Sequence, residues 1–154
     1  GLKMALDTSG PALRAALKAG PWLIKPNAQE LAEVLGGEVV SVMAQAQAAS
    51  RLHGQGIEHV VISHGAEGVN WFSVGSALHA TPPKVSVAST VGAGDSLLAG
   101  MLHGLVSADT PEQTLRTATA IAAMAVTQIG FGISDAAQLA QLEQGVRVRP
   151  LTEQ

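Results

Sequence analysis

STVGAGDSLLAG, residues Ser89–Gly100, joins a Gly-Ala-Gly run to an apolar pattern with the period of a helix. Leu97 and Met101 stand four residues apart, and the pattern predicts a helix over residues 94–107 that begins at the glycine run. Peptide N–H groups at a helix N-terminus lack partners and form the positive end of the helix dipole, so this run is suited to bind an anion. Asp95 has two interpretations: a carboxylate that stabilises the helix end, or a base that takes a proton during phosphoryl transfer.

A second glycine-bearing loop, SHGAEG, spans Ser63–Gly68 and directly follows a run rich in β-branched residues, His59–Ser63. Such a run is typical of a buried strand in a parallel sheet. Ligands of open α/β sheets bind at the carboxyl ends of the strands, so this loop is a candidate for phosphate contact. A tight turn without a ligand is the alternative interpretation.

A third loop, KPNAQE, spans Lys25–Glu30 and follows another predicted strand, residues 22–25. Asn27 with Glu30 three residues later matches a capping box, which is a purely structural interpretation. The functional alternative is that the oxygens of Asn27 and Glu30 hold a hydrated Mg²⁺ beside phosphates, since hard cations prefer oxygen ligands. Lys25 either adds positive charge near phosphate or is a surface lysine. Neither GxxxxGK[ST] nor GxGxxG after a strand occurs in the sequence.

The remaining pattern alternates strands and helices in the first half and is mostly helical at the end. This order favours an α/β fold with a mainly parallel sheet flanked by helices. No repeat or linker divides the chain, so one domain is predicted. Strands are expected at residues 4–7, 22–25, 59–63, 69–73, 76–80 and 84–87, with a tail or terminal strand at 146–151. Helices are expected at residues 11–19, 28–35, 41–53, 94–107, 111–128 and 136–144.

The composition of the 154 residues, 47% hydrophobic and 14% charged, is that of an ordered globular domain. The formal net charge of −3 gives no basic footprint for nucleic acid, and no apolar run reaches the roughly 20 residues that span a bilayer. The absence of cysteine excludes disulfides and thiolate metal sites and fits a reducing cytoplasm. Because the chain opens with Gly1 and no initiator methionine, we expect a piece of a longer polypeptide.

Together, the three loops resemble motifs of the ribokinase-like (PfkB) carbohydrate kinases. GAGD resembles the C-terminal signature of that family, NAQE resembles its Asn-x-x-Glu motif, and SHGAEG resembles its nucleotide loop. AIAAMAVTQIG, Ala120–Gly130, is similar to the helix that closes over adenine in these enzymes. DTSG at Asp7–Gly10, with IKPN and STVGAGD, looks most like the 1-phosphofructokinases of the family. The resemblance covers nearly the whole chain in the family's order.

The resemblance implies ATP-dependent phosphorylation of a phosphosugar, and it favours the conversion of fructose 1-phosphate to fructose 1,6-bisphosphate. It implies that Asp95 is the catalytic base, with the run Gly92, Ala93 and Gly94 at the transferring phosphoryl group. The N–H groups of Ala93, Gly94 and Asp95 would stabilise the charge on that group. The implied contacts are, for ATP, Lys25, Ser63, His64, Gly65, Ala66, Glu67, Gly68 and Gly94, and, for Mg²⁺, Asn27 and Glu30.

Two departures from the family bear on this interpretation. Many relatives carry aspartate at the position of Ser89, where it helps to hold a monovalent cation, so the resemblance does not extend to potassium activation. The sequence also lacks the N-terminal half that proteins of this family have, and that half is expected to supply most sugar-binding residues and a β-sheet lid. Residues 1–154 therefore resemble the C-terminal, nucleotide-binding half, and we expect this part alone to bind nucleotide weakly and to be inactive.

Other functions stay open at this point. The sugar is alternatively tagatose 6-phosphate or another sugar, and the chain is alternatively a nucleotide-binding module without catalysis. A dinucleotide-dependent oxidoreductase is disfavoured by the missing dinucleotide fingerprint. A zinc site is disfavoured because the five histidines lack paired ligand spacing. The expected partners are a phosphosugar and ATP, with no nucleic acid and no membrane, and a homodimer is left open.

Overall fold

The computed structural model describes residues 2–151 and divides the chain into two compact units. Of the described residues, the first unit contains 2–64, 70–78 and 150–151. The second unit contains Gly65–Val69 and His79–Arg149. The single domain expected from the sequence therefore stays a prediction.

Among the described residues, six strands form one sheet in which each strand neighbours the next one in the chain. The first three pair in parallel, with Ala5 opposite Leu23 and Leu23 opposite His59. The next two match the strands predicted at residues 69–73 and 76–80. The two-residue turn between them can join only antiparallel strands, so the sheet is mixed. The predicted α/β architecture is confirmed. The strands are β1 (Ala5–Leu6), β2 (Leu23–Ile24), β3 (His59–Ser63), β4 (Val69–Ser73), β5 (Ser76–Thr81) and β6 (Arg147–Pro150).

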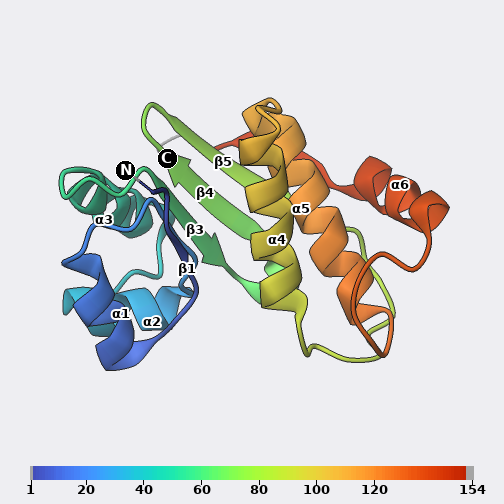
Figure 1. Cartoon of the computed structure of the whole chain (residues 1–154), viewed down its shortest axis with the longest axis horizontal. Coiled ribbons are helices and arrows are strands. Elements are labelled where there is room, and N and C mark those ends of the chain that lie inside the picture. Colours follow the sequence, from blue (N-terminus) through green and yellow to red (C-terminus); the bar gives the residue numbers. More distant parts are fainter. Residues whose placement is uncertain (1, 152–154) are drawn as a thin grey trace. The chain divides into compact units, whose positions relative to one another are not determined.

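The first unit contains three helices, α1 (Gly10–Leu17), α2 (Ala28–Leu35) and α3 (Val42–His53), which Figure 1 draws in blue to green. Asn27 caps α2 and Ser41 caps α3, and each side chain accepts a hydrogen bond from the backbone N–H group three residues later. Apolar side chains of these helices and of β2 and β3 form one buried core. Its buried members include Leu13, Leu17, Ile24, Leu31, Ala49, Leu52, Ile57, Val60 and Ile62.

The helices of the second unit pack closely because glycines of one helix face the next. α4 and α5 lie side by side (Figure 1), and a Cβ atom at Gly100 would come within 2.6 Å of Ala118 Cα. At Gly104 it would come within 2.6 Å of Thr114 Oγ1. The second unit contains η1 (Gly65–Glu67), α4 (Ala93–Val106), α5 (Pro111–Val126) and α6 (Ala136–Gly145).

One predicted element is wrong. No strand lies between Thr81 and α4, where residues 84–87 were expected to form one. Pro82 and Pro83 precede this segment, and proline has no N–H group to donate to a sheet. The segment is a loop instead, and it lines a cavity described below. The other predicted strands and helices are present, with bounds that differ by at most two residues.

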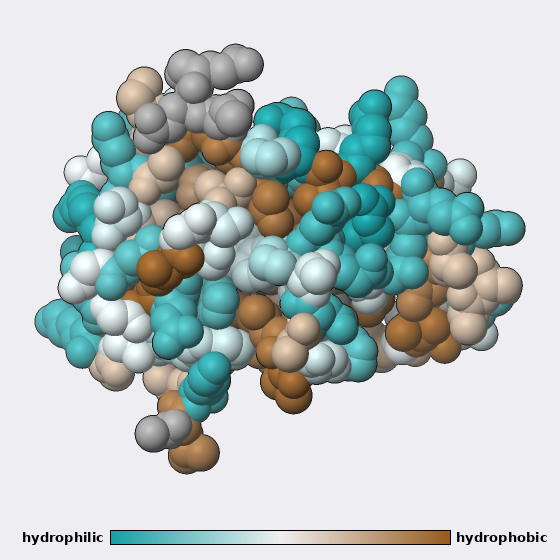
Figure 2. All heavy atoms as spheres, turned by 90° about the horizontal axis from the view of Figure 1, so that it is seen from above, coloured by the Kyte–Doolittle hydropathy of each residue, from teal (hydrophilic) through white to brown (hydrophobic). Residues whose placement is uncertain are grey.

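Within residues 2–151, none of the helices combines the length and the apolar content that crossing a bilayer requires. Several large apolar side chains are nevertheless exposed, among them Val91, Ile129 and Phe131. On the face drawn in Figure 2, apolar residues form separate patches among hydrophilic ones. These patches do not form a continuous apolar surface on that face.

Candidate functional site

The second unit encloses a cavity of about 550 Å³, a volume typical of small-molecule sites. Three segments of the chain form its walls: the loop after β3, the loop before α4 with the first residue of that helix, and one face of α5. Its lining residues are mostly apolar or small. They are Gly65, Ala66, Gly68, Val69, Pro82, Pro83, Lys84, Val85, Val87, Thr90, Ala93, Thr119, Ala122, Ala123 and Val126.

The glycine run marks the start of α4, as the sequence predicts. Gly92 is the N-cap residue and has a φ of +79°, in the left-handed region that favours glycine. A Cβ atom there would also come within 3.2 Å of Phe131 Cε1. Ser96 N donates to the Gly92 carbonyl over 2.9 Å and closes the first turn. The backbone angle therefore favours glycine at this position, whereas the exposed ring of Phe131 is free to shift slightly.

The first N–H groups of α4 are largely open. Ala93, which lines the cavity, donates its N–H group to the Thr90 carbonyl over 3.4 Å, a long hydrogen bond. The N–H groups of Gly94 and Asp95 make no backbone hydrogen bond among the described residues. Unpaired N–H groups at the positive end of a helix attract anions. Of the three predicted amides, those of Gly94 and Asp95 are thus the ones left available.

Asp95 lies in the first turn of α4 and is exposed. Its carboxylate makes no hydrogen bond or ion pair with the other described residues. A negative charge in the first turn stabilises the helix N-terminus, so Asp95 fits the structural interpretation given above. The same freedom leaves both carboxylate oxygens able to accept a proton from a substrate hydroxyl.

The SHGAEG loop contributes three residues to the cavity: Gly65, Ala66 and Gly68. Gly68 also has a structural task, because its φ is +113° and a Cβ atom there would lie 2.0 Å from the Ala80 carbonyl oxygen. Glu67 is exposed and is not among the lining residues. The loop therefore combines a turn that only glycine can make with a wall of the cavity.

Ser63 and His64 belong to the first unit. Ser63 donates its N–H group to the Pro26 carbonyl over 3.3 Å. Its backbone pairs with Asn27 in a parallel bridge, so the first residue of the SHGAEG loop neighbours Pro26 and Asn27 of the KPNAQE loop. His64 Nε2 lies 3.3 Å from the side-chain nitrogen of Asn70.

The KPNAQE loop holds its polar side chains in defined contacts within the first unit. Asn27 Oδ1 accepts from Glu30 N over 2.8 Å, and Glu30 Oε2 accepts from Asn27 N over 2.9 Å, so the predicted capping box is confirmed. Lys25 is only 7% exposed and pairs with Asp7 Oδ2 over 3.1 Å. The alternative of a surface lysine is therefore wrong. No cluster of three or more His, Cys, Asp or Glu side chains suited to a metal is present in residues 2–151.

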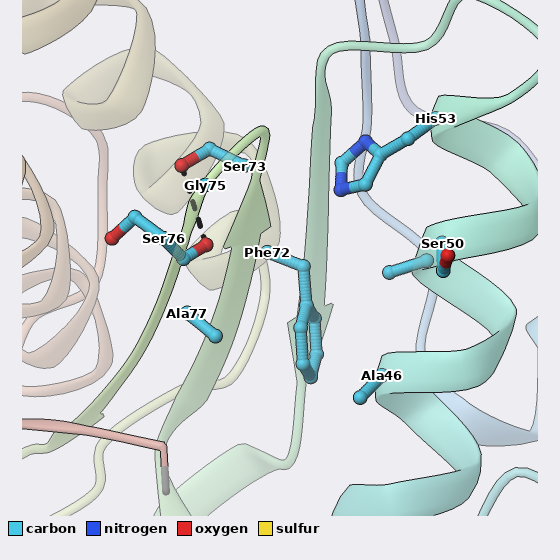
Figure 3. Close-up of a pocket in the computed structure, with 9 residues that line it drawn as sticks. Ala46, Ser50, His53, Phe72, Ser73, Gly75, Ser76 and Ala77 are labelled. Carbon is cyan, nitrogen blue, oxygen red and sulfur yellow. Dashed lines mark hydrogen bonds between the residues drawn. The ribbon is translucent and has the colours of Figure 1, made fainter.

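A smaller hollow of about 290 Å³ lies in the first unit, between α3 and the hairpin of β4 and β5 (Figure 3). Ser50 and His53 line it from α3, and Ser73 and Ser76 line it from the hairpin, with their hydroxyls pointing away from α3 in Figure 3. His53 Nδ1 is engaged with the Ile57 carbonyl at 2.8 Å. No Asp, Glu, Lys or Arg is among its lining residues, so it lacks the charged groups that bind phosphate. The cavity of the second unit is the better candidate site.

Two parts of the cavity in the second unit differ from the main expectation drawn from the sequence, in which Lys84 lies on a strand and the Ala and Thr run mostly packs against other helices. Lys84 was expected on a strand, yet it lines the cavity as part of a loop. Thr119 precedes the stretch Ala120–Gly130 that was expected over adenine, and it lies on the cavity wall too. Its spacing of three, four and seven residues from Ala122, Ala123 and Val126 was the available signal, because such residues share one helix face.

Comparisons with known proteins identify the family of the chain. The family model for pfkB family carbohydrate kinases matches residues 2–138. The chain is 48% identical over 149 residues to the 1-phosphofructokinase of Vibrio cholerae serotype O1. The aligned region covers 97% of this chain and 47% of that protein. It is also 48% identical over 144 residues to the 1-phosphofructokinase of Escherichia coli K12. That alignment covers 94% of this chain and 46% of that protein.

Solved structures give the same result for the fold. Phosphofructokinase-2 from Escherichia coli, in complex with substrates and products, superposes with a TM-score of 0.84 at 29% identity over 94% of this chain and 47% of that chain. Ribokinase from Arabidopsis thaliana, complexed with ribose and ATP, superposes with a TM-score of 0.79 at 25% identity over 94% of this chain and 48% of that chain. The chain thus spans about half the length of the relatives it matches.

Proposed function

Because the chain belongs to the pfkB family of carbohydrate kinases, we propose that it is the ATP-binding and catalytic-base half of a kinase that phosphorylates a phosphosugar. The observation that carries this proposal is the cavity of the second unit. There the glycines of the SHGAEG loop, the N-terminus of α4 and a face of small residues on α5 surround one space. Glycines beside a helix N-terminus suit phosphates, and a wall of small apolar side chains suits a nucleobase.

In the proposed reaction, Asp95 accepts the proton of the sugar hydroxyl as that oxygen bonds to the γ-phosphorus of ATP. The bond from the γ-phosphorus to the β,γ-bridging oxygen breaks, and ADP leaves. The open N–H groups of Gly94 and Asp95 support this assignment, since they are placed at a helix N-terminus where they stabilise charge on the transferring group. An ordinary carboxylate suffices as the base, because the hydroxyl is only weakly activated in a loose transition state.

We assign Asn27 and Glu30 to a hydrated Mg²⁺ that accompanies ATP. Their capping box uses one oxygen of each side chain and leaves Glu30 Oε1 outside it, so the donor set fits an ion held through water. Mg²⁺ commonly takes only one or two side-chain oxygens and completes its shell with water and phosphate oxygens. Bound there, the ion would neutralise phosphate charge.

For the acceptor we propose fructose 1-phosphate, phosphorylated to fructose 1,6-bisphosphate. The similarity to 1-phosphofructokinases of two bacteria at 48% identity supports this choice. The competing acceptor is tagatose 6-phosphate.

For assembly, we propose a homodimer. A tetrameric inhibited form is described for phosphofructokinase-2 from Escherichia coli, and sedimentation of this chain would test its own state.

Two measurements test the proposal. Calorimetric titration of the chain with MgATP should give saturable heat. A chimera in which residues 1–154 replace the matching half of the Escherichia coli 1-phosphofructokinase should then release ADP with fructose 1-phosphate and much more slowly with tagatose 6-phosphate. Heat without turnover in the chimera would instead support a nucleotide-binding module, and saturable binding of NAD without ATP binding would overturn the kinase.

A further inference from the structure

Three polar side chains of the first unit form a hydrogen-bond chain that leads from a buried helix position to the SHGAEG loop. Gln45 of α3 is 1% exposed and Asn70 of β4 is 4% exposed. Asn70 Nδ2 donates to Gln45 Oε1 over 2.8 Å and lies 3.3 Å from His64 Nε2. Gln45 Nε2 in turn donates to the carbonyl oxygens of Val39 and Val40 over 3.2 Å and 3.4 Å. The proposed reaction uses none of these contacts.

The direction of each hydrogen bond in this chain is fixed by the bond before it. A carbonyl oxygen only accepts, so the Gln45 amide must present its NH2 group to Val39 and Val40 and its oxygen to Asn70. That oxygen also only accepts, so Asn70 must present its NH2 group, which cannot accept a hydrogen bond. His64 Nε2 faces the same NH2 group and must therefore be an acceptor. A neutral imidazole with an accepting Nε2 carries its proton on Nδ1.

The burial of two amides needs a reason beyond stability. A buried amide stabilises a fold only when its hydrogen bonds are made, whereas an apolar pair of the same shape has no such requirement. A completed buried network adds rigidity instead, because only one arrangement satisfies all of its members. Here the outermost member is the ring of His64, which is half-buried. The network thus fixes the orientation of that ring.

The loop residues that follow His64 have few anchors of their own. Gly65 and Ala66 carry no polar side chain, and Gly65–Glu67 is exposed. A Cβ atom at Gly65 would have no neighbour within 4 Å. The chain becomes buried again only at Gly68. The contacts of the His64 ring therefore hold the start of this exposed stretch.

We propose that Gln45 and Asn70 are positioning residues for phosphate binding. They hold the His64 ring by Nε2, in the tautomer protonated on Nδ1, and so preorganise the SHGAEG loop before a ligand arrives. The inference rests on the proposed nucleotide-binding function, in which this loop contacts the phosphates of ATP. Neither residue lines the cavity of the second unit, so each acts on the ligand only through the loop. A preorganised loop loses less conformational freedom on binding, which raises the affinity.

Nitrogen-15 NMR of the histidine rings at about pH 8, where an ordinary histidine is neutral, tests the fixed tautomer. The parent chain should show His64 protonated on Nδ1 and His59 protonated on Nε2, because His59 Nδ1 accepts from Trp71 Nε1. Asn70→Asp has the same shape but presents only acceptors, so the proton of His64 should move to Nε2 while His59 stays unchanged. A parent His64 protonated on Nε2, or a proton that stays on Nδ1 in Asn70→Asp, overturns the proposal.

Calorimetric titration of the full chain with MgATP and, separately, with magnesium tripolyphosphate tests the effect on binding. Asn70→Leu removes the donor without a change of charge and should weaken the binding of both ligands alike, by about three- to tenfold. Ser41→Ala is the matched control, because it removes the cap of the helix that carries Gln45 and leaves the hydrogen-bond chain intact. This control should be less stable than the parent and bind both ligands like it.

Each other outcome has a separate meaning. Parent-like affinity of Asn70→Leu overturns the positioning role and leaves the proposed function standing. A loss confined to MgATP, or an equal loss in Ser41→Ala, also overturns that role, since the effect would then not pass from Asn70 through the loop to phosphate. A parent chain that binds neither ligand overturns the nucleotide proposal itself and the positioning role with it. Thermal unfolding verifies that each variant is folded, and Asn70→Val replaces Asn70→Leu if the latter does not fold.

Discussion

Gly68 and Ala80 approach each other so closely that only glycine fits at position 68. A Cβ atom at Gly68 would lie 2.0 Å from the Ala80 carbonyl oxygen, and the φ of Gly68 is +113°. The clash would be with backbone, which cannot swing aside as a side chain can. The last residue of the SHGAEG loop is thus fixed against β5 by a main-chain contact.

We therefore expect Gly68→Ala to lower the free energy of unfolding by about 3 kcal/mol or more, or to prevent folding. Gly65→Ala is the matched control. Gly65 also has a positive φ, +55°, but no atom lies within 4 Å of its Cβ position, so backbone strain of about 1 kcal/mol is the only cost. Urea unfolding of both variants measures the difference. Equal losses would show that the contact with Ala80 does not hold the loop.

The unpaired hydroxyls of α5 predict a gain in stability. Thr119→Val and Thr114→Val each remove a buried polar atom without a partner and should raise the free energy of unfolding by about 1 kcal/mol. Without ligand the two variants should behave alike, because the burial of the two side chains is alike. Urea midpoints without nucleotide provide the measurement. A loss of stability in both variants would mean that the hydroxyls have partners in solution.

His59 predicts a pH dependence of stability. Its ring lies between Trp22 and Trp71, and Trp71 Nε1 donates to His59 Nδ1 over 3.3 Å. Burial lowers the pKa of His59 below its ordinary value, Lys3 and His53 lower it further, and Glu58 opposes them. The folded chain thus binds this proton less readily than the unfolded chain does. The stabilising contribution is complete above about pH 6.5 and is lost as the pH falls through the lowered pKa.

Urea midpoints between about pH 7.5 and pH 5 check this dependence, since the midpoint should fall toward the acid side of that range. His59→Asn retains an acceptor for Trp71 but does not titrate there, so its midpoint should fall less. His103→Asn, at an exposed position of α4, serves as the control and should keep the full decline. A parent midpoint that rises toward acid would contradict a lowered pKa for His59.

The role of Asp95 predicts a selective loss of turnover. In the chimera with the Escherichia coli enzyme, Asp95→Asn should reduce kcat by about 10²- to 10⁴-fold, because asparagine cannot accept the hydroxyl proton. The KM for MgATP should stay nearly unchanged, since the N–H groups at the helix start remain. Steady-state kinetics with ADP release measures both constants. Turnover near that of the parent chimera would return Asp95 to a purely structural role at the helix end.

Asn27 predicts a combined effect on stability and on Mg²⁺. Asn27→Ala removes the α2 cap and should cost about 1 kcal/mol of stability. It should also raise the Mg²⁺ concentration needed for half-maximal chimera activity. Ser41→Ala removes the α3 cap and is the matched control, with a similar loss of stability and an unchanged Mg²⁺ titration. The same Mg²⁺ curve for both variants would leave Asn27 as a cap alone.

The local features of this fold were predictable because the signals are local. Asn27, Ser41 and Thr110 each precede an apolar helical pattern, and each is the N-cap residue in the structure. The turn at Val74 and Gly75 was equally visible, because a glycine separates two runs of strand-forming residues, and Gly75 has a φ of +82° in the structure. Such signals need only a few neighbouring residues.

Features that depend on distant partners were not predictable. The burial of Lys25 follows from its pairing with Asp7, which no spacing rule indicates. The segment at residues 84–87 has strand-like residues, yet Pro82 and Pro83 and its place in the cavity wall decide its conformation. The helical spacing of Thr119 indicated its place beside the other residues of the α5 wall, but the missing partner of its hydroxyl depends on tertiary packing, which no sequence pattern shows.

Among residues 2–151, those that line the cavity in the second unit all fall between Gly65 and Val126. A single pair of genetic crossovers on either side of that stretch would therefore transfer the complete lining from one gene to another as a block. The parts of a protein outside the block are then free to diverge in sequence while the lining is inherited intact.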